Sequence, residues 1–163
     1  MNYIEKIKEI FDKNKDKRIV VLGTSCVGKT TIIKTINYGL DMDEEIFPLL
    51  TKEEAEYVCS TPWTEEIGKA MNNFVKTRLI VEPDKPMFGT VLLDCDLIIY
   101  LNISDELLLK RSILRGANFE DVKSMKKSIE KDIKESLIPT IGINVDEELI
   151  NYEENIINKY RIQ

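Results

Sequence analysis

The order of apolar and polar positions changes several times along the first forty residues. Apolar side chains recur at helical spacing near the start and predict a helix over residues 2–13; they are Ile4, Ile7, Ile10 and Phe11. Residues 19–22 are a short continuous apolar run, as expected of a strand buried on both faces of a parallel sheet. After a glycine-rich turn, residues 30–39 predict a second helix that ends at Gly39.

The middle of the chain, residues 40–94, has a less regular pattern. A weak strand is predicted at 45–50, and Thr51 with Glu54 forms a capping box for a short helix. A longer helix is predicted to begin at Thr61–Pro62, with one apolar face made by Trp63, Ile67, Ala70, Met71 and Phe74. Residues 78–82 (RLIVE) predict a strand that Pro83 closes.

The second half alternates strand-like and helix-like segments. Residues 97–102 (LIIYLN) predict the strongest strand, and Ser104 caps a helix that runs to Arg115. An amphipathic helix from Val122 to Leu137 follows, then a strand at 140–145 and a terminal helix capped by Asp146. This alternation predicts one α/β domain over residues 1–163: a three-layer fold with a parallel sheet of about five strands and helices on both faces.

Composition narrows the class of protein. The net charge of −6 disfavours a protein that grips duplex nucleic acid, and the absence of histidine removes histidine-based catalysis and metal binding. No apolar run approaches the length of a membrane span, and the charged N-terminal residues do not resemble a signal peptide. Three cysteines without a C-x-x-C pair argue against a disulfide framework, so we expect a cytoplasmic protein. The oligomeric state stays open.

The strongest chemical signal is GTSCVGKT at residues 23–30, between the first strand and the second helix. Gly23, Gly28, Lys29 and Thr30 complete the Walker A pattern, in which glycines let backbone N–H groups point at phosphate oxygens. Lys29 would supply charge to the β- and γ-phosphates, and the Thr30 hydroxyl would coordinate Mg²⁺. We therefore expect ATP and Mg²⁺ as cofactors. The predicted nucleotide-binding residues are Gly23, Thr24, Ser25, Cys26, Val27, Gly28, Lys29, Thr30 and Thr31.

An acidic residue should serve the metal or the acceptor hydroxyl beside Thr30. We favour Glu82, because it ends a predicted strand that a helical segment separates from the 23–30 loop. Asp84 and Asp94 remain alternatives.

Residues 95–116 (CDLIIYLNISDELLLKRSILRG) resemble a segment of the thymidylate kinases and deoxynucleoside kinases, which are P-loop nucleoside and nucleotide kinases. The resemblance implies catalytic roles for Arg111 and Arg115, a lid region at about 111–136, and an acceptor-binding insert at about 40–77. These families commonly carry Asp-Arg where this chain has Glu82-Pro83-Asp84-Lys85. Residues 116–121 are expected to be a mobile part of the lid, because they contain little that could anchor them in the core.

The expected function is an ATP-dependent kinase whose acceptor is a small molecule: a nucleoside or nucleoside monophosphate, with a deoxynucleotide favoured. Two alternatives stay open, a non-catalytic nucleotide-binding regulator and a polynucleotide-end kinase. A GTPase is disfavoured, because no [NT]-K-x-D sequence follows a late strand.

Overall fold

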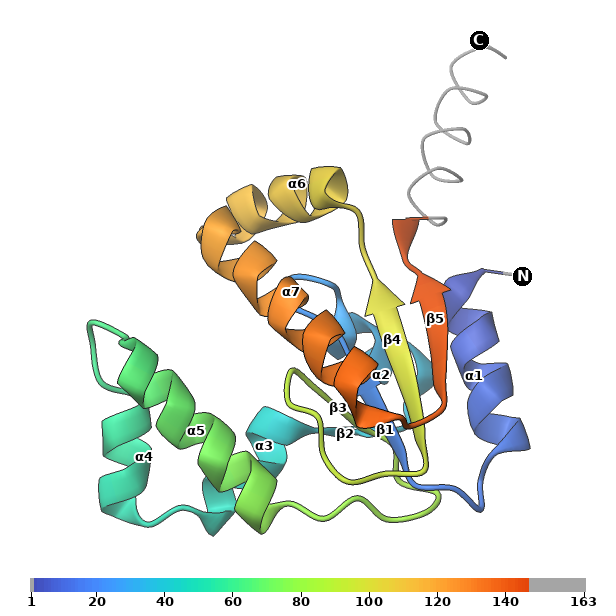
Figure 1. Ribbon diagram of the computed structural model, residues 1–163, viewed down its shortest axis with the longest axis horizontal. Coiled ribbons are helices and arrows are strands. Elements are labelled where there is room, and N and C mark those ends of the chain that lie inside the picture. Colours follow the sequence, from blue (N-terminus) through green and yellow to red (C-terminus); the bar gives the residue numbers. More distant parts are fainter. Residues whose placement is uncertain (1, 147–163) are drawn as a thin grey trace, which may run out of the picture.

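The computed structural model describes residues 2–146, which form a five-stranded sheet with helices around it (Figure 1). All four strand pairings are parallel, in the order β2-β3-β1-β4-β5. The strands are β1 (Ile19–Leu22), β2 (Leu40–Asp41), β3 (Met87–Gly89), β4 (Leu97–Asn102) and β5 (Thr140–Asn144). Because every strand runs the same way, the sheet has one amino edge and one carboxyl edge.

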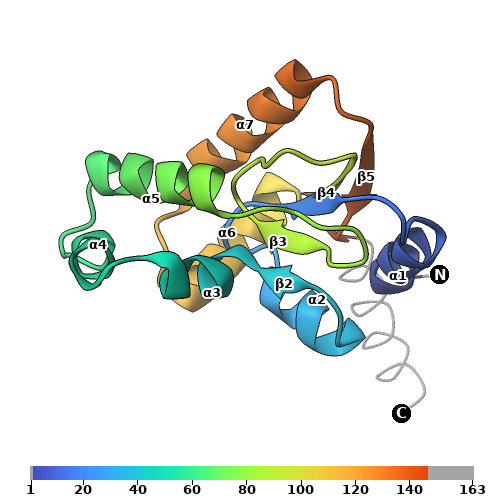
Figure 2. The ribbon, with the colours of Figure 1, turned by 90° about the horizontal axis from the view of Figure 1, so that it is seen from below.

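The helices within residues 2–146 are α1 (Tyr3–Lys13), α2 (Lys29–Ile36), α3 (Met42–Ile46), the 3₁₀ turn η1 (Phe47–Leu49), α4 (Lys52–Val58), α5 (Glu65–Arg78), α6 (Asp105–Arg115) and α7 (Phe119–Ser136). Seen from below, α1 and α2 lie to one side of the sheet and α5 and α7 to the other, while α4 lies out beyond α3 and α5 (Figure 2). In this part of the chain, no helix is long and apolar enough to cross a membrane.

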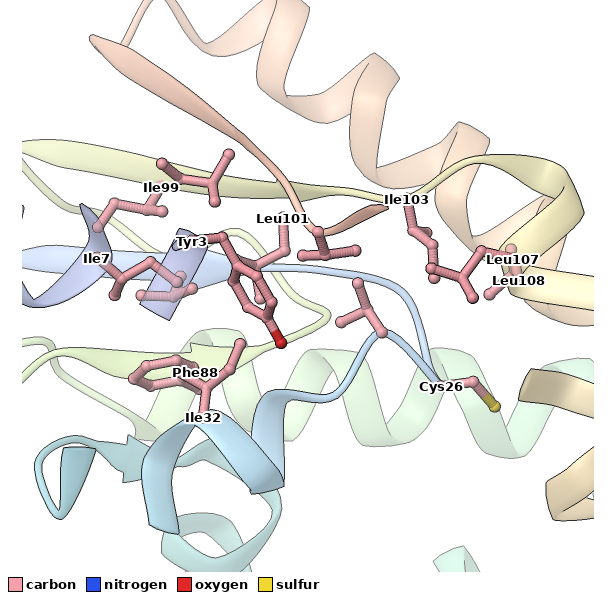
Figure 3. Packing of buried hydrophobic residues seen from close by; sticks show 14 of the residues in the cluster. Tyr3, Ile7, Cys26, Ile32, Phe88, Ile99, Leu101, Ile103, Leu107 and Leu108 are labelled. Atoms are coloured by element: carbon pink, nitrogen blue, oxygen red, sulfur yellow. The ribbon is translucent and has the colours of Figure 1, made fainter. Parts of the chain in front are cut away.

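Two apolar clusters hold the layers together, one on each face of the sheet. Side chains alternate between faces along a strand, so Val21 and Ile99 join one cluster while Val20 and Ile98 join the other. The first cluster includes side chains of α1, α2 and α6 (Figure 3), and the second includes side chains of α3, α5 and α7. The predicted α/β fold with helices on both faces of a parallel sheet is therefore confirmed.

Several predicted elements have the expected bounds. The strands at 19–22 and 97–102 form as predicted, and the capping box of Thr51 and Glu54 opens α4. Ser104 caps α6 by accepting a hydrogen bond from the Leu107 N–H at 3.2 Å. The second helix ends earlier than predicted, at Ile36, because Asn37 adopts the left-handed conformation that terminates helices.

The two strands predicted in the middle of the chain are wrong. Residues 45–50 belong mostly to α3 and η1 instead, following an N-cap in which the Asp41 side chain accepts from the Asp43 N–H. Residues 78–82 do not form a strand. Arg78 is the last residue of α5, where its guanidinium donates to the Glu54 carboxylate, and the residues after it lead to β3. The third strand lies further on, at β3. The predicted helix start at Thr61 is also corrected, since α5 begins at Glu65 after the cap Thr64.

The expected lack of anchors in 116–121 is wrong as well. Only residues 116–118 separate α6 from α7, and Phe119 at the start of α7 packs against the first cluster. Val122, one residue beyond the predicted segment, is buried in the same cluster. The predicted terminal helix after Asp146 lies outside the described residues.

Candidate functional site

The 23–30 loop leaves the carboxyl end of β1 and turns into α2. The Gly23 N–H donates to the Gly89 carbonyl at 3.2 Å, so the loop begins level with the end of β3. A Cβ at Gly23 would come within 2.7 Å of Val27, which leaves no room for a side chain. Gly28 has a φ of +103°, a conformation that favours glycine. Both glycines of the predicted motif therefore have a structural reason to be glycine.

The Lys29 side chain folds back over this loop. Its ammonium donates to the carbonyl of Thr24 at 2.8 Å and to the carbonyl of Gly23. Burial lowers the pKa of Lys29 to about 8, and nearby Arg115 acts in the same direction, while Asp43 and Asp41 oppose the shift. Among residues 2–146, no carboxylate lies within 4 Å of the Lys29 ammonium. Its positive charge is therefore not neutralised by an ion pair and could bind an anion at the loop.

Two aspartates that the sequence interpretation did not select lie with Lys29. Asp41 and Asp43 line a cavity of about 150 Å³, here called the loop cavity, together with Lys29, Thr30 and Arg115. They reach it because β2 ends at Asp41, at the same edge of the sheet as the loop, and α3 begins there. Burial raises the pKa of Asp43, and the neighbouring Asp41 carboxylate adds to the rise.

Glu82, the favoured acid, is not brought to the loop. It precedes β3 at the amino edge of the sheet, where Lys85 pairs with it at 3.1 Å (the segment between α5 and β3 runs along the lower side of Figure 1). The alternatives lie at that edge too: Asp84 accepts from the Tyr38 hydroxyl, and Asp94 pairs with Arg18 at 2.9 Å. The prediction failed because it rested on a strand that does not form.

Both predicted arginines of α6 do lie beside the loop. Arg111 donates through Nη1 to the Val27 carbonyl at 2.7 Å, so it fixes the loop backbone. Arg115 lines the loop cavity and also a second cavity of about 250 Å³, here called the outer cavity. The outer cavity is further lined by Tyr3, Cys26, Gly28, Thr31, Arg111 and Leu114. Arg111 is therefore a positioning residue for the loop, whereas Arg115 faces open space.

Helix α7 is bonded to the same loop. The Thr24 hydroxyl, which is buried, donates to the Val122 carbonyl at 2.7 Å, and the Ser25 hydroxyl lies 3.5 Å from the Met125 sulfur. Lys126 ties α7 to the end of β4 by donating to the Ile103 carbonyl at 2.7 Å. The loop and α7 are therefore in direct contact through the Thr24 and Ser25 side chains.

A third and larger hollow, of about 610 Å³, adjoins the loop and is here called the large cavity. Ser25, Asp43 and Thr90 line both the loop cavity and the large cavity. Cys26, Gly28 and Arg115 line both the loop cavity and the outer cavity. The three hollows are thus neighbours at the carboxyl edge of the sheet, and Lys29 lines the one that shares residues with both others.

The oxygen donors in the loop cavity fit a magnesium ion. Mg²⁺ is held by one or two carboxylates, the substrate phosphates and several waters, and not by a dedicated cage of side chains. The Thr30 hydroxyl and the carboxylates of Asp41 and Asp43 supply such a set. Residues 2–146 contain no cluster of three or more His, Cys, Asp or Glu side chains that could hold a metal ion.

In comparisons with known proteins, no family model matches this chain, and no curated protein sequence matches it. The function is therefore inferred from the residues and cavities described above.

Proposed function

We propose that this protein is an ATP-dependent kinase that transfers the γ-phosphoryl group to a small-molecule acceptor, a nucleoside or nucleoside monophosphate being the leading class. The observation that supports the proposal is the placement of Lys29, Thr30, Asp41 and Asp43 around one cavity that shares lining residues with two others. A kinase needs a site for the phosphates of ATP, a space for the base of ATP and a space for the acceptor. The loop cavity, the outer cavity and the large cavity correspond to these three needs.

In this proposal the 23–30 loop is a P-loop that holds the phosphates of ATP. Backbone N–H groups of the loop and the start of α2 face the phosphate oxygens, and Lys29 moves its ammonium from the loop carbonyls to the β- and γ-phosphates. The outer cavity receives the base, and Arg115 stabilises the charge that develops on the transferred group.

Asp43 serves the acceptor, because it stands between the loop cavity and the large cavity. A nucleoside monophosphate would attack through an ionised phosphate oxygen. With a nucleoside, the acceptor hydroxyl oxygen attacks the γ-phosphorus, the bond to the bridging oxygen breaks, and ADP leaves with that electron pair. The hydroxyl proton passes to the Asp43 carboxylate and from there to water. When bound, Mg²⁺ supplies charge neutralisation on the phosphate oxygens, with Thr30 and Asp41 as its protein ligands.

The two alternatives predict different surfaces. A regulator that only senses nucleotide needs no acceptor space, yet a hollow of about 610 Å³ adjoins the loop. A polynucleotide-end kinase needs a basic track for the strand, whereas the large cavity contains Asp43 and Asp132 and one cation, Lys76, among its described lining residues. A small-molecule acceptor fits both observations. The free thiols of Cys26, Cys59 and Cys95 accord with a reducing cytoplasm as its compartment.

The test is a coupled assay of ADP release across nucleosides, nucleoside monophosphates and short DNA ends, each with ATP and Mg²⁺. We expect release above the background ATPase rate with at least one nucleoside or nucleoside monophosphate and with none of the DNA ends. ADP release with the DNA ends alone would indicate a polynucleotide-end kinase instead. Tight ATP binding without release for any acceptor would favour the regulator.

A further inference from the structure

We infer that the large cavity binds an acceptor without a phosphate group: a ring-bearing alcohol that is neutral or carries an amine. This inference rests on the proposed kinase function, since it names the acceptor class of the same site. It divides the leading class, because a nucleoside qualifies and a nucleoside monophosphate does not.

The charges that line the large cavity disfavour a phosphate. Asp43 and Asp132 contribute two carboxylates, and Lys76 is the one cation among the described lining residues. A phosphate monoester carries about −1.5 to −2 charges at neutral pH, so it would meet a site whose own balance is negative. A neutral ligand meets no such penalty, and an amine gains from it.

None of the four arginines in residues 2–146 lines the large cavity. Arginine is the side chain that recognises phosphate through two parallel hydrogen bonds. Arg18 is bound by Asp94 and Asp96 at the amino edge, and Arg78 is bound by Glu54 and the Leu49 carbonyl. Arg111 lines the outer cavity, and Arg115 lines the outer cavity and the loop cavity.

Helix N-termini are the other common phosphate sites, and those next to the large cavity are already occupied by acidic groups. At α3 the cap is Asp41, and the first turn carries three further carboxylates, of Asp43, Glu44 and Glu45. At α5 the Thr64 hydroxyl accepts from the Ile67 N–H, and Glu65 and Glu66 follow in the first turn. These carboxylates neutralise the positive end of each helix dipole, so neither terminus is left to attract a further anion.

The remaining lining suits a flat ring that carries hydroxyl or amide groups. The Trp63 indole is 63% exposed and lies against Gly68, where a Cβ would come within 2.5 Å of the ring. Met71 and Met125 offer adaptable apolar contact. Polar groups that can both donate and accept hydrogen bonds come from Asn72, Thr90, Ser124 and Ser128. The unphosphorylated hydroxyl of such a ligand can then reach Asp43.

Trp63 makes the test direct, because it is the chain's single tryptophan and lines the cavity. Its fluorescence is titrated with three matched pairs: thymidine and thymidine 5′-monophosphate, adenosine and adenosine 5′-monophosphate, glucosamine and glucosamine 6-phosphate. We expect at least one unphosphorylated member to bind, and to bind at least about tenfold more tightly than its phosphate. Equal or tighter binding of the phosphates, or no response to any unphosphorylated member, would overturn the inference.

A matched pair of variants on α7 tests the charge argument. Asp132→Lys changes the cavity lining. It should reduce, at least about threefold, the ratio by which the unphosphorylated ligand binds more tightly than its phosphate. Glu135→Lys makes the same charge change on the same helix but not at the lining residues, and should leave the preference unchanged. Equal effects of both would mean that net charge, and not the cavity, sets the preference.

ADP release measured on the same samples separates the two proposals. Binding of a nucleoside or amino sugar without ADP release would contradict the proposed kinase function but support the inferred ligand class. ADP release with the monophosphates alone would keep the kinase function and remove the inferred acceptor class.

Discussion

Both edges of the sheet carry charged side chains, but within residues 2–146 these are paired at one edge and unpaired at the other. At the amino edge, Arg18 pairs with Asp94 and Asp96, both at 2.9 Å, and Lys85 pairs with Glu82. At the carboxyl edge, none of Lys29, Asp41, Asp43 and Arg115 is in an ion pair with another described residue, although all four line the loop cavity.

The charged side chains at the amino edge bind one another, whereas those at the carboxyl edge are free to bind a ligand. A mutation at the amino edge breaks a pair and should change stability, whereas a mutation at the carboxyl edge should change chemistry at nearly constant stability.

The largest effect is expected from Lys29→Ala. Removing this charge from the phosphate cradle should lower kcat/KM at least about 100- to 1,000-fold, because it acts where charge develops in the transition state. The measurement is ADP release with the best acceptor. Lys34→Ala on the exposed side of the same helix is the control and should remain active. An active Lys29→Ala enzyme with intact circular dichroism would remove the loop from the catalytic centre.

Asp43→Asn should lower kcat about a hundredfold, because it removes the proposed proton acceptor while keeping the shape of the side chain. Glu82→Gln at the amino edge is the comparison and should alter kcat less than about twofold, since it loses only an exposed ion pair. Steady-state kinetics on both variants decide between them. The reverse order of effects would restore Glu82 as the acid of the site.

The two arginines of α6 should be separable by kinetics. Arg115→Ala should lower kcat about tenfold to a hundredfold with a smaller change in ATP affinity, because Arg115 faces the cavity where the phosphoryl group would be transferred. Arg111→Ala should raise the KM for ATP instead, because it frees the Val27 carbonyl and loosens the loop. A pure KM effect in both variants would mean that each arginine only binds ground-state nucleotide.

Nucleotide affinity should depend on pH through Lys29. In the free protein its pKa is about 8, and phosphates favour the protonated form, so binding above pH 8 must take up a proton. The Kd for ATP with Mg²⁺ should then be flat from pH 7 to 8 and rise up to about tenfold per pH unit above that. Calorimetry at several pH values measures it. Lys29→Arg stays charged and should lack the rise; the same rise in that variant would assign it to another group.

The smallest effect on activity is expected from Arg18→Ala. It should leave kcat unchanged and lower the melting temperature by a few degrees at most, since its ion pairs are solvent-exposed. Hydrogen bonds from Arg18 lower the pKa of Asp96 below its usual value of 3.8. A lowered carboxyl pKa gives stability that is present above about pH 4 and is lost as the pH falls, so the variant should lose part of this acid dependence. Thermal melts from pH 2 to 7 test it.

The sequence pattern predicted elements whose signals are local. The strand at 97–102, the Ser104 cap, and the strand and helix on either side of the 23–30 loop each depend on residues within a few positions of one another, and each forms as expected. Helix α4 was predicted for the same reason, from the reciprocal bonds of Thr51 and Glu54.

The middle of the sheet depends on distant partners and was not predicted. Strand β3 has three residues and β2 has two, too few to show a period, and both form by pairing with strands far away in the sequence. Asp41 and Asp43 were missed together with β2, since only that strand brings them to the loop. One signal was present: a D-x-D sequence directly after the helix that follows a Walker A pattern.

The hydrogen bond between the Thr24 hydroxyl and the Val122 carbonyl joins the 23–30 loop to a helix, α7, that also lines the large cavity. Helix α7 contacts the loop through Thr24 and Ser25, and its other residues Ser128 and Asp132 line the large cavity. We therefore expect a ligand that displaces α7 to affect the loop, and a ligand on the loop to affect the large cavity. Thermodynamic linkage makes that influence equal in both directions: the factor by which ATP changes acceptor affinity is the factor by which the acceptor changes ATP affinity. Thr24→Val, which keeps the shape and removes the hydroxyl, should bring that factor closer to one.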